Sequence, residues 1–523
     1  MNPLQLPSGP TLSNGNLDFL SYNGLFTIFS TIGISSGKWY FEATPSGSDA
    51  AYAMVGVANA FASTTDYVGA NANSWGYYAS NGNKYNSGTG TAYGASYGSG
   101  DVIGAALDMD AGTLTFYKNG ASQGTAFTGL TGTLFLVVGD GGTPQTPAIS
   151  VNFGQRPFAS TAPSGFKALC TQNLPTPTIG ATASTQAGKF FNAVTWTGTG
   201  STQNITGVGF QPDFTWLKSR SNVQGNVFTD VVRGTGKMLV SETSSAEVTN
   251  SAYGYLSAFG SDGFTLTPGT TGANLTNYNG WTYVGWNWKA NGAGVTNTAG
   301  SITSTVSANT TSGFSVVTFT GNGGTPSTVG HGLGSAPKFI IQKRRNDAGG
   351  WNCYHASLPV DYRIDLNTTA AATYDPGAWN STNPTSSVYS IQNPGNTNIS
   401  GATYVAYCFA EVPGFSKFGS YTGNGSADGP FVYCGFRPAY VMIKASSDGS
   451  FPWLVFDRTR NPSNVVTQLL LPNASDSEYT VSALDFTANG FKLRDTNTSR
   501  NNSGTTYIFM AFAEAPQKFA LAR

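Results

Sequence analysis

A signature that recurs three times in the last two-thirds of the chain constrains the fold most strongly. Each copy is an aromatic segment that ends in Thr-Gly-x-Gly, at residues 195–200, 318–323 and 420–425. Each is followed by Pro-x-aromatic-x-x-x-Lys and closes on an aromatic strand, and the prolines lie 125 and 101 residues apart. This spacing is too long for a solenoid repeat and suits a self-contained β domain. We therefore expect three related β-sandwich-like domains, at residues 191–290, 313–412 and 413–523.

The composition supports rigid β structure with many tight turns. Only 10% of the residues are charged, against about 25% in an average globular protein. The chain has 66 glycines and 13% aromatic residues, which is unlike a disordered chain. Lys plus Arg and Asp plus Glu both total 26, so no basic excess points to nucleic acid. The densest basic cluster, residues 343–345, is interpreted as a solvated strand end.

The segment at residues 13–170 reads as a series of short alternating strands. Turn residues recur every 8–12 positions, and Asn119-Gly120 is a strong hairpin signal. No stretch carries helical apolar periodicity over three turns. We expect an antiparallel β-sandwich here.

Several motifs in this segment follow one another in the order found in a known family. They lie at residues 37–42, 55–58, 100–108, 114–120, 151–158 and 163–166. In this order they resemble a SPRY (B30.2-like) domain. The resemblance implies a concanavalin-like sandwich of two antiparallel sheets that binds proteins or peptides through loops at one end, and it implies no catalysis.

The three repeats carry a second resemblance. With their closing segments, such as residues 404–411 and 510–514, they look like uncharacterised repeat domains of tailed-bacteriophage virion proteins. The rest of the chain reads as connections: an N-terminal arm at residues 1–12 and linkers at 171–190 and 291–312. Repeats 2 and 3 follow each other almost directly, and repeat 2 lacks a clear copy of one middle element.

Candidate catalytic groups are few. His331 lies in a glycine-rich turn and His355 in an aromatic segment, and neither lies near a nucleophile elbow. The acidic residues of two matching loops could instead form a carboxylate pair of the glycosidase kind, although polar surface loops are the favoured interpretation. These residues are Glu242 and Glu247 in repeat 1, and Asp476 and Glu478 in repeat 3.

No metal site or cofactor is expected. Asp108 and Asp110 have the alternation of a calcium loop but lack its later ligands, so a hairpin turn is favoured. The four cysteines show no paired spacing, and Cys408 and Cys434 lie in apolar runs that predict buried side chains.

Aromatic and amide side chains in one segment of the SPRY-like region are the candidate ligand-binding residues. Aromatic rings stack on sugars, amides bond to hydroxyls, and the same mixture also suits a protein-binding surface. Whether the first two rings point outward or fill the sandwich core stays open at this stage. The candidates are Trp75, Tyr77, Tyr78, Asn81, Asn83 and Tyr85.

These observations predict a bacteriophage virion protein without enzymatic activity, most simply a tail fibre component that binds a host surface glycan or protein. The alternatives are a capsid decoration or head-fibre protein and an enzyme that degrades host polysaccharide. The expected location is the virion, assembled in the host cytoplasm. The N-terminal arm is expected to bind other virion proteins, and a homo-oligomer, with a trimer as one option, is expected. Neither nucleic-acid binding nor membrane insertion is expected.

Overall fold

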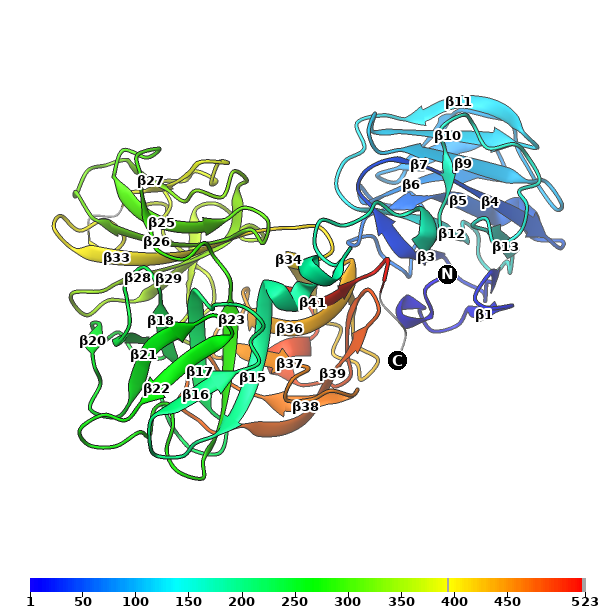
Figure 1. The fold of residues 1–523 in the computed structure, drawn as a ribbon. Coiled ribbons are helices and arrows are strands. Elements are labelled where there is room, and N and C mark those ends of the chain that lie inside the picture. Colours follow the sequence, from blue (N-terminus) through cyan, green and yellow to red (C-terminus); the bar gives the residue numbers. More distant parts are fainter. Residues whose placement is uncertain (393–394, 520–523) are drawn as a thin grey trace. The chain divides into compact units, whose positions relative to one another are not determined.

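The computed structural model describes residues 1–392 and 395–519, and these are built almost wholly from β-strands (Figure 1). The all-β prediction is therefore confirmed. The chain divides into two compact units, Met1–Thr176 (unit 1) and Pro177–Arg523 (unit 2). In the part of the chain that is described, no helix has the length and apolar character needed to cross a membrane.

Unit 1 is a sandwich of two antiparallel sheets with one hydrophobic core between them. Alternating side chains from both sheets enter this core, among them Phe41, Val55 and Leu114. The first sheet contains, in order, β1 (Thr11–Ser13), β2 (Asp18–Leu20), β13 (Ala148–Asn152), β4 (Lys38–Ser46), β9 (Ile103–Asp108), β10 (Thr113–Lys118) and β11 (Ala121–Phe127), and β14 (Lys167–Ala168) pairs with β4. The second contains β3 (Phe26–Ile34), β12 (Leu134–Asp140), β5 (Ala53–Ala58), β6 (Ser74–Tyr78), β7 (Asn83–Asn86) and β8 (Thr89–Ala92).

The first residues of the chain pack onto this sandwich, so the prediction of an N-terminal arm at residues 1–12 is wrong. The side chain of Met1 is buried, and its ammonium donates to the carbonyl of Asn16 at 2.5 Å. The amide of Asn2 donates to the carbonyl of Phe29 at 2.7 Å, and a short 3-10 turn follows, η1 (Pro3–Gln5). Apolar contact and backbone pairing hold the segment in place.

Unit 2 contains three main antiparallel sheets with a common strand order. In each, the strand that closes the repeat lies between the strand of the Thr-Gly-x-Gly signature and the strand that carries the lysine. Repeat 1 contains β15 (Phe191–Thr197), β23 (Thr282–Trp288), β17 (Phe214–Ser219), β18 (Val227–Asp230), β19 (Lys237–Val240) and β20 (Val248–Thr249). Repeat 2 contains β24 (Val295–Asn297), β25 (Ser304–Asn309), β26 (Phe314–Thr320), β33 (Thr403–Ala410), β28 (Pro337–Arg344), β29 (Trp351–His355), β30 (Tyr362–Asp365) and β31 (Thr373–Tyr374). Repeat 3 contains β34 (Ser416–Thr422), β41 (Thr506–Pro516), β36 (Phe436–Ala445) and β37 (Leu454–Asp457).

A second sheet accompanies each main sheet. In repeat 1 it is β16 (Gln203–Thr206), β22 (Gly263–Thr267) and β21 (Tyr255–Gly260); in repeat 2, β27 (Ser327–Gly330) and β32 (Val388–Ile391); in repeat 3, β35 (Phe431–Tyr433), β40 (Gly490–Leu493), β39 (Tyr479–Thr487) and β38 (Val466–Leu469). This second sheet has the fewest strands in repeat 2, which agrees with the middle sequence element that repeat 2 lacks. A short helix, α1 (Thr498–Asn501), precedes β41.

Each of the three main sheets buries one face in a hydrophobic core that all three repeats share. Equivalent aromatic residues of the three closing strands meet there: Trp288, Phe409 and Phe512, with ring centroids 5.7–6.0 Å apart. Aromatic groups at such distances contribute both buried area and favourable edge contacts. The repeats are therefore parts of one compact unit, not a row of separate modules.

Both predicted linkers are folded: residues 171–176 belong to unit 1, and residues 177–190 and 291–312 take part in unit 2. Residues 171–190 contain the 3-10 turns η3 (Thr171–Asn173), η4 (Ala183–Thr185) and η5 (Ala187–Lys189), and Ile179 and Ala187 enter the shared core. Residues 291–312 contain strands β24 and β25 of the repeat 2 sheet. Ser, Thr and Asn in these segments form turns and edge strands instead of free linkers, because the neighbouring sheets offer hydrogen-bond partners.

One buried asparagine closes the Thr-Gly-x-Gly turn in each repeat. Its side-chain oxygen accepts the amide of the residue between the two glycines, and its carbonyl accepts the amide of the second glycine. A Cβ on the first glycine would overlap a backbone carbonyl, and the second glycine has φ of +67° to +73°, so both positions require glycine. The asparagines are Asn277, Asn398 and Asn501.

Candidate functional site

The predicted ligand-binding residues lie on two adjacent strands of unit 1, β6 and β7, and on the turn between them, but they do not share one face. Tyr77 is fully buried, and its ring packs against those of Tyr97 and Phe116 at 4.9 and 5.1 Å. Trp75, two residues before it, packs partly buried against the same core. Tyr77 is therefore a core residue, and its prediction as a binding residue is wrong.

The remaining candidates lie on the outer face. Tyr78 and Tyr85 meet edge to face with ring centroids 5.8 Å apart, and Asn81 donates from Nδ2 to the Tyr85 hydroxyl at 3.3 Å. Asn83 is half-buried, and its backbone amide donates to Oδ1 of Asn81 at 2.9 Å. The structure thus brings together an aromatic and amide surface from Tyr78, Asn81, Asn83 and Tyr85.

A long loop between β5 and β6, residues 59–73, adds to this surface. Tyr67 packs against Tyr85 with ring centroids 6.0 Å apart. Phe61 is 65% exposed, and its backbone is fixed because its amide donates to Asn59 and its carbonyl accepts from Asn73. Sequence reasoning missed both residues, because only the folded loop places Tyr67 beside β7 and leaves Phe61 exposed.

Both histidines are buried and make structural hydrogen bonds. His331 accepts the amide of Leu333 at Nδ1, and its Nε2 lies 3.2 Å from the carbonyl of Thr385. His355 accepts the amide of Ser357, and its Nε2 lies 3.1 Å from the carbonyl of Phe509. Burial lowers the pKa of His355 to about 4, so the ring is neutral at ordinary pH.

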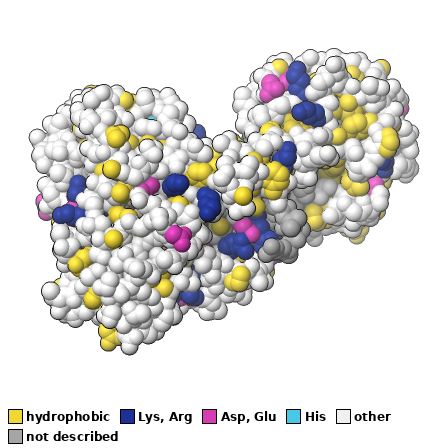
Figure 2. Space-filling model, viewed as in Figure 1, with side chains coloured by type: hydrophobic (Ala, Val, Ile, Leu, Met, Phe, Trp, Pro, Cys, Tyr) yellow, Lys and Arg dark blue, Asp and Glu magenta, His cyan; other side chains and the backbone are white. Residues whose placement is uncertain are grey.

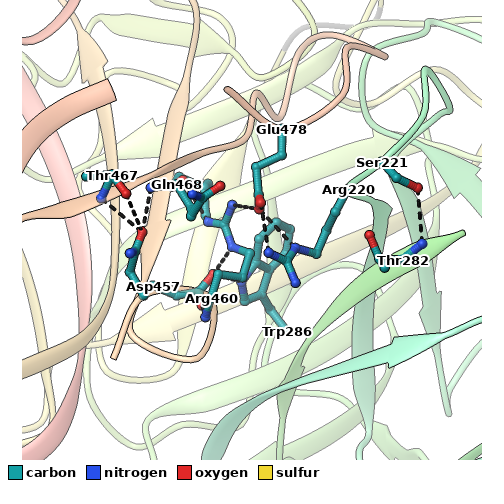
Figure 3. A network of polar contacts seen from close by, with 11 residues as sticks. Arg220, Ser221, Thr282, Trp286, Asp457, Arg460, Thr467, Gln468 and Glu478 are labelled. Carbon is teal, nitrogen blue, oxygen red and sulfur yellow. Dashed lines mark hydrogen bonds and ion pairs between the residues drawn. The ribbon is translucent and has the colours of Figure 1, made fainter. Parts of the chain in front are cut away.

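Two of the candidate acids form ion pairs between repeats. Figure 3 shows Glu478 of repeat 3 held by Arg220 of repeat 1 at 2.8 Å and by Arg460 of its own repeat at 2.9 Å. Arg460 also binds Asp457, which accepts the indole N–H of Trp286 from repeat 1 at 2.9 Å (Figure 3). Glu478 and Asp457 therefore share the buried Arg460 as a partner, whereas a glycosidase needs two carboxylates that are free to act on substrate.

Glu247 has the same arrangement at the junction of repeats 1 and 2. It binds Arg233 of its own repeat at 3.0 Å and Arg345 of repeat 2 at 2.9 Å. Burial alone would raise the pKa of Glu247, but Arg345 and Arg233 outweigh it and hold the pKa below its usual range. Arg233 also binds Asp230, which accepts the hydroxyl proton of Tyr407 at 2.9 Å.

The other two acids do not join these clusters. Glu242 accepts from the amide and side chain of Asn226 at 3.0 and 3.2 Å, and burial raises its pKa. Asp476 is half-buried in its loop. The polar-loop interpretation therefore fits Asp476, whereas the other three acids hold the folded chain together.

The lysines of the repeated signature are buried and join neighbouring repeats. Lys218 donates to the carbonyl of Ser475 at 2.8 Å, Lys343 to Ser244 at 3.3 Å and Lys444 to Thr369 at 3.0 Å. Burial lowers the pKa of each to about 8. The interpretation of residues 343–345 as a solvated strand end is thus wrong for Lys343 and Arg345, whereas Arg344 binds Asp347 and the carbonyl of Ala348 in the adjoining surface loop.

The remaining sequence candidates have structural roles. Asp108 binds Lys38 at 2.9 Å and accepts two amides of the hairpin turn, and Asp110 accepts the amide of Gly37. Cys408 and Cys434 are buried as predicted, and burial raises their pKa. Among residues 1–392 and 395–519, no group of three His, Cys, Asp or Glu side chains is placed to hold a metal ion.

The surface that the structure exposes is dominated by uncharged polar groups. Figure 2 shows charged and apolar side chains scattered singly or in small groups among such groups on the visible face of each unit. The charges engaged between repeats are withdrawn from this surface, and aromatic rings are among the large apolar side chains that it exposes.

The two units match two protein families. A model described as a domain of unknown function (DUF7483) covers residues 186–516, more than half of the chain. The chain belongs to the DUF7483 family. A second model, the SPRY domain, covers residues 38–156, which confirms the SPRY resemblance of unit 1. The DUF7483 match spans all three repeats and carries no statement of their origin, so the resemblance to phage virion repeats stays a prediction.

Two relatives share 127 residues with this DUF7483 protein. Ran-binding protein 10 of Danio rerio and Ran-binding protein 9 of Homo sapiens are each 36% identical over 127 residues, 23% of this chain. The match spans only 20% and 17% of their own lengths. Among solved structures, the SPRY domain of human HERC1 is 22% identical and covers 30% of this chain and 99% of its own, with a TM-score of 0.28. The TRIM65 PSpry domain is 19% identical over 29% of this chain and 89% of its own, with a TM-score of 0.25.

Proposed function

We propose that the protein is a binding component of a tailed-bacteriophage virion, part of a tail fibre, that contacts the host surface without chemical turnover. The observation that carries the binding role is the outer face of unit 1. There Tyr67, Tyr78, Asn81 and Tyr85 contact one another, and Phe61 is exposed on the braced loop that carries Tyr67. Rigid aromatic rings with amide neighbours provide contact area at low entropy cost.

The virion setting rests on the repeat signature and its resemblance to phage domains. The structure adds a physical argument: unit 2 withdraws many of its charges into inter-repeat pairs and leaves a neutral surface. A neutral polar surface on a closed β framework suits a passive scaffold. Several copies on one particle would make weak contacts avid.

A competition experiment tests the proposal. Purified full-length chain in excess is expected to block adsorption of the phage to its host cells. The Phe61→Ala chain is expected to compete about tenfold less well, the scale for losing an aromatic anchor at a binding surface. Tyr22→Ala is the matched control, because Tyr22 is another exposed aromatic residue of unit 1, at 67%, and it should compete fully.

Antibody labelling of purified particles supplies the second arm. Label at the tail is expected, whereas label on the head would replace the tail-fibre role with capsid decoration. Absence of the chain from particles by mass spectrometry would refute the virion role. Release of reducing ends from host polysaccharide would instead favour an enzyme.

A further inference from the structure

One turn of repeat 1 displays an aromatic pair. Tyr278 and Trp281 lie between β22 and β23 with ring centroids 4.4 Å apart and planes tilted by 39°. Tyr278 is 43% exposed, and Trp281 is half-buried against the core of its repeat. The indole is thus held by the core of the repeat, and the phenol ring that packs on it at a tilt is exposed.

The turn that carries Tyr278 recurs in the other two repeats with different side chains. In each repeat, the backbone amide at this position donates to the hydroxyl of the tyrosine that is the second residue of the closing strand. The three donors are Tyr278, Ile399 and Asn502, and the N···O distances are 2.9, 2.9 and 2.8 Å.

The position of Trp281 is equivalent in the same way. Its carbonyl accepts the amide of the first glycine of the signature at 2.8 Å, as do the carbonyls of Ala402 at 2.8 Å and Thr505 at 2.9 Å. Both positions meet the fold's requirement through backbone atoms alone. The fold accepts Ile with Ala or Asn with Thr here, so it does not require two aromatic rings.

The surroundings of the pair are polar and uncharged. Residues 197–203 and 269–281 contain no Asp, Glu, Lys or Arg. Asn279 is exposed beside Gly200, where a Cβ would lie 3.3 Å from that of Asn279, and Thr199 and Ser201 are exposed on the facing turn. Arg220, which pairs with Thr282 through its backbone amide, has its guanidinium held by Glu478.

We propose that Tyr278 and Trp281 form a binding subsite for the ring of a neutral sugar. The outward face of Tyr278 offers an apolar, electron-rich surface to the C–H groups of a pyranose, and the indole below keeps it in place. The Asn279 amide and the Ser201 hydroxyl can exchange hydrogen bonds with the sugar hydroxyls, whereas the Thr199 hydroxyl is held within the turn by Ser201 and Asn277. An ionic ligand would find no free counter-charge on these two segments. This subsite lies in unit 2 and does not depend on the binding role proposed for unit 1.

The repeats themselves supply variants that test this subsite. Tyr278→Asn with Trp281→Thr gives repeat 1 the residues that repeat 3 carries at the equivalent positions, so the turn keeps its backbone contacts. The probes are neutral oligosaccharides of glucose, galactose, mannose, N-acetylglucosamine and N-acetylgalactosamine, immobilised on an array and titrated in solution. We expect the full-length chain to bind at least one of them, and the double variant to bind it about tenfold or more weakly.

Tyr374→Ala is the control, because Tyr374 is 64% exposed and pairs edge to face with Tyr362 in repeat 2. It should leave sugar binding unchanged. The single variant Tyr278→Asn, which keeps Trp281 packed against the core, should retain the wild-type melting temperature of unit 2 and still bind the sugar more weakly. The proposal is overturned if no probe binds the wild-type chain, if the double variant binds as well as wild type, or if Tyr374→Ala weakens binding equally. Binding of a proline-rich peptide at this turn in place of the sugars would also overturn it.

Discussion

At the scale of single residues, the glycines of the repeated signature are required by the backbone conformation and close packing of the turn. Gly321 shows this in repeat 2: a Cβ there would fall against the carbonyl oxygen of Ile399, well inside van der Waals contact. The amide of Gly321 also donates to the carbonyl of Ala402 at 2.8 Å, so the turn cannot move away without losing this bond.

Gly321→Ala is therefore expected to lower the free energy of unfolding of unit 2 by about 1–3 kcal/mol, the usual cost of forcing an extra methyl group into a packed site. Gly188→Ala is the matched control in the same unit, because its Cβ would meet no atom within 4 Å. Chemical denaturation measures both. Equal stability of the two variants would contradict this account of the signature.

At the scale of elements, loops of one repeat are held by strands of the next. Buried ion pairs require good geometry, and removing one partner leaves a costly unpaired charge. Glu478 and Glu247 each join two arginines, one from their own repeat and one from a neighbour.

Glu478→Gln is expected to destabilise unit 2 by about 2–3 kcal/mol, since it leaves Arg220 and Arg460 without a carboxylate at this point. Asp347→Asn, at a surface pair with an acid that is 70% exposed, should cost less than about 1 kcal/mol. Thermal unfolding of unit 2 measures both. A surface-like cost for Glu478→Gln would show that the inter-repeat pair contributes little.

The sequence predicted many of the strands and the positions of the repeats, but it did not predict the ion pairs between repeats. Turn residues and alternation along the chain indicated strands and repeat positions, because these signals are local. Arg220 and Glu478 lie 258 residues apart, and no local pattern says that they meet. For the candidate site, alternation could not say whether Tyr77 or Tyr78 faces inward. The answer depends on which face of the second sheet of unit 1 is covered by the first sheet.

At the scale of the whole molecule, unit 2 is a cyclic arrangement in which each repeat contacts both others. The lysine of repeat 1 reaches repeat 3, that of repeat 2 reaches repeat 1, and that of repeat 3 reaches repeat 2. The three junctions are not identical. His355, at the junction of repeats 2 and 3, takes the position that Asp230 and Asp457 hold at the other two.

This third junction predicts an acid-sensitive stability. The pKa of His355 is about 4 in the folded chain and about 6.5 when unfolded. Between these values the unfolded chain binds the extra proton, so the free energy of unfolding falls as pH drops from about 6.5 to about 4, by up to about 3 kcal/mol. Above about pH 6.5, His355 is neutral in both states, and its contribution to the free energy of unfolding is fully present.

Urea unfolding at several pH values measures this slope, and His355→Gln supplies the comparison. The variant should lose the share of the acid slope that His355 contributes, while the contributions of His331 and of the buried carboxyls remain. Identical slopes for the two chains between pH 6.5 and 4 would contradict a neutral, buried His355.

Read along the chain alone, the residues of this protein establish its β class, the SPRY segment, the three copies of the signature and the scarcity of charge. Spacing, alternation and turn chemistry carry these features, and each acts over a few neighbouring residues. The shared aromatic core, the burial of Tyr77, the packing of Met1 and the pairing of acids with arginines between repeats emerge only on folding. They depend on which sheet faces cover one another, and burial and ion pairing follow from contacts between residues that are distant in the chain.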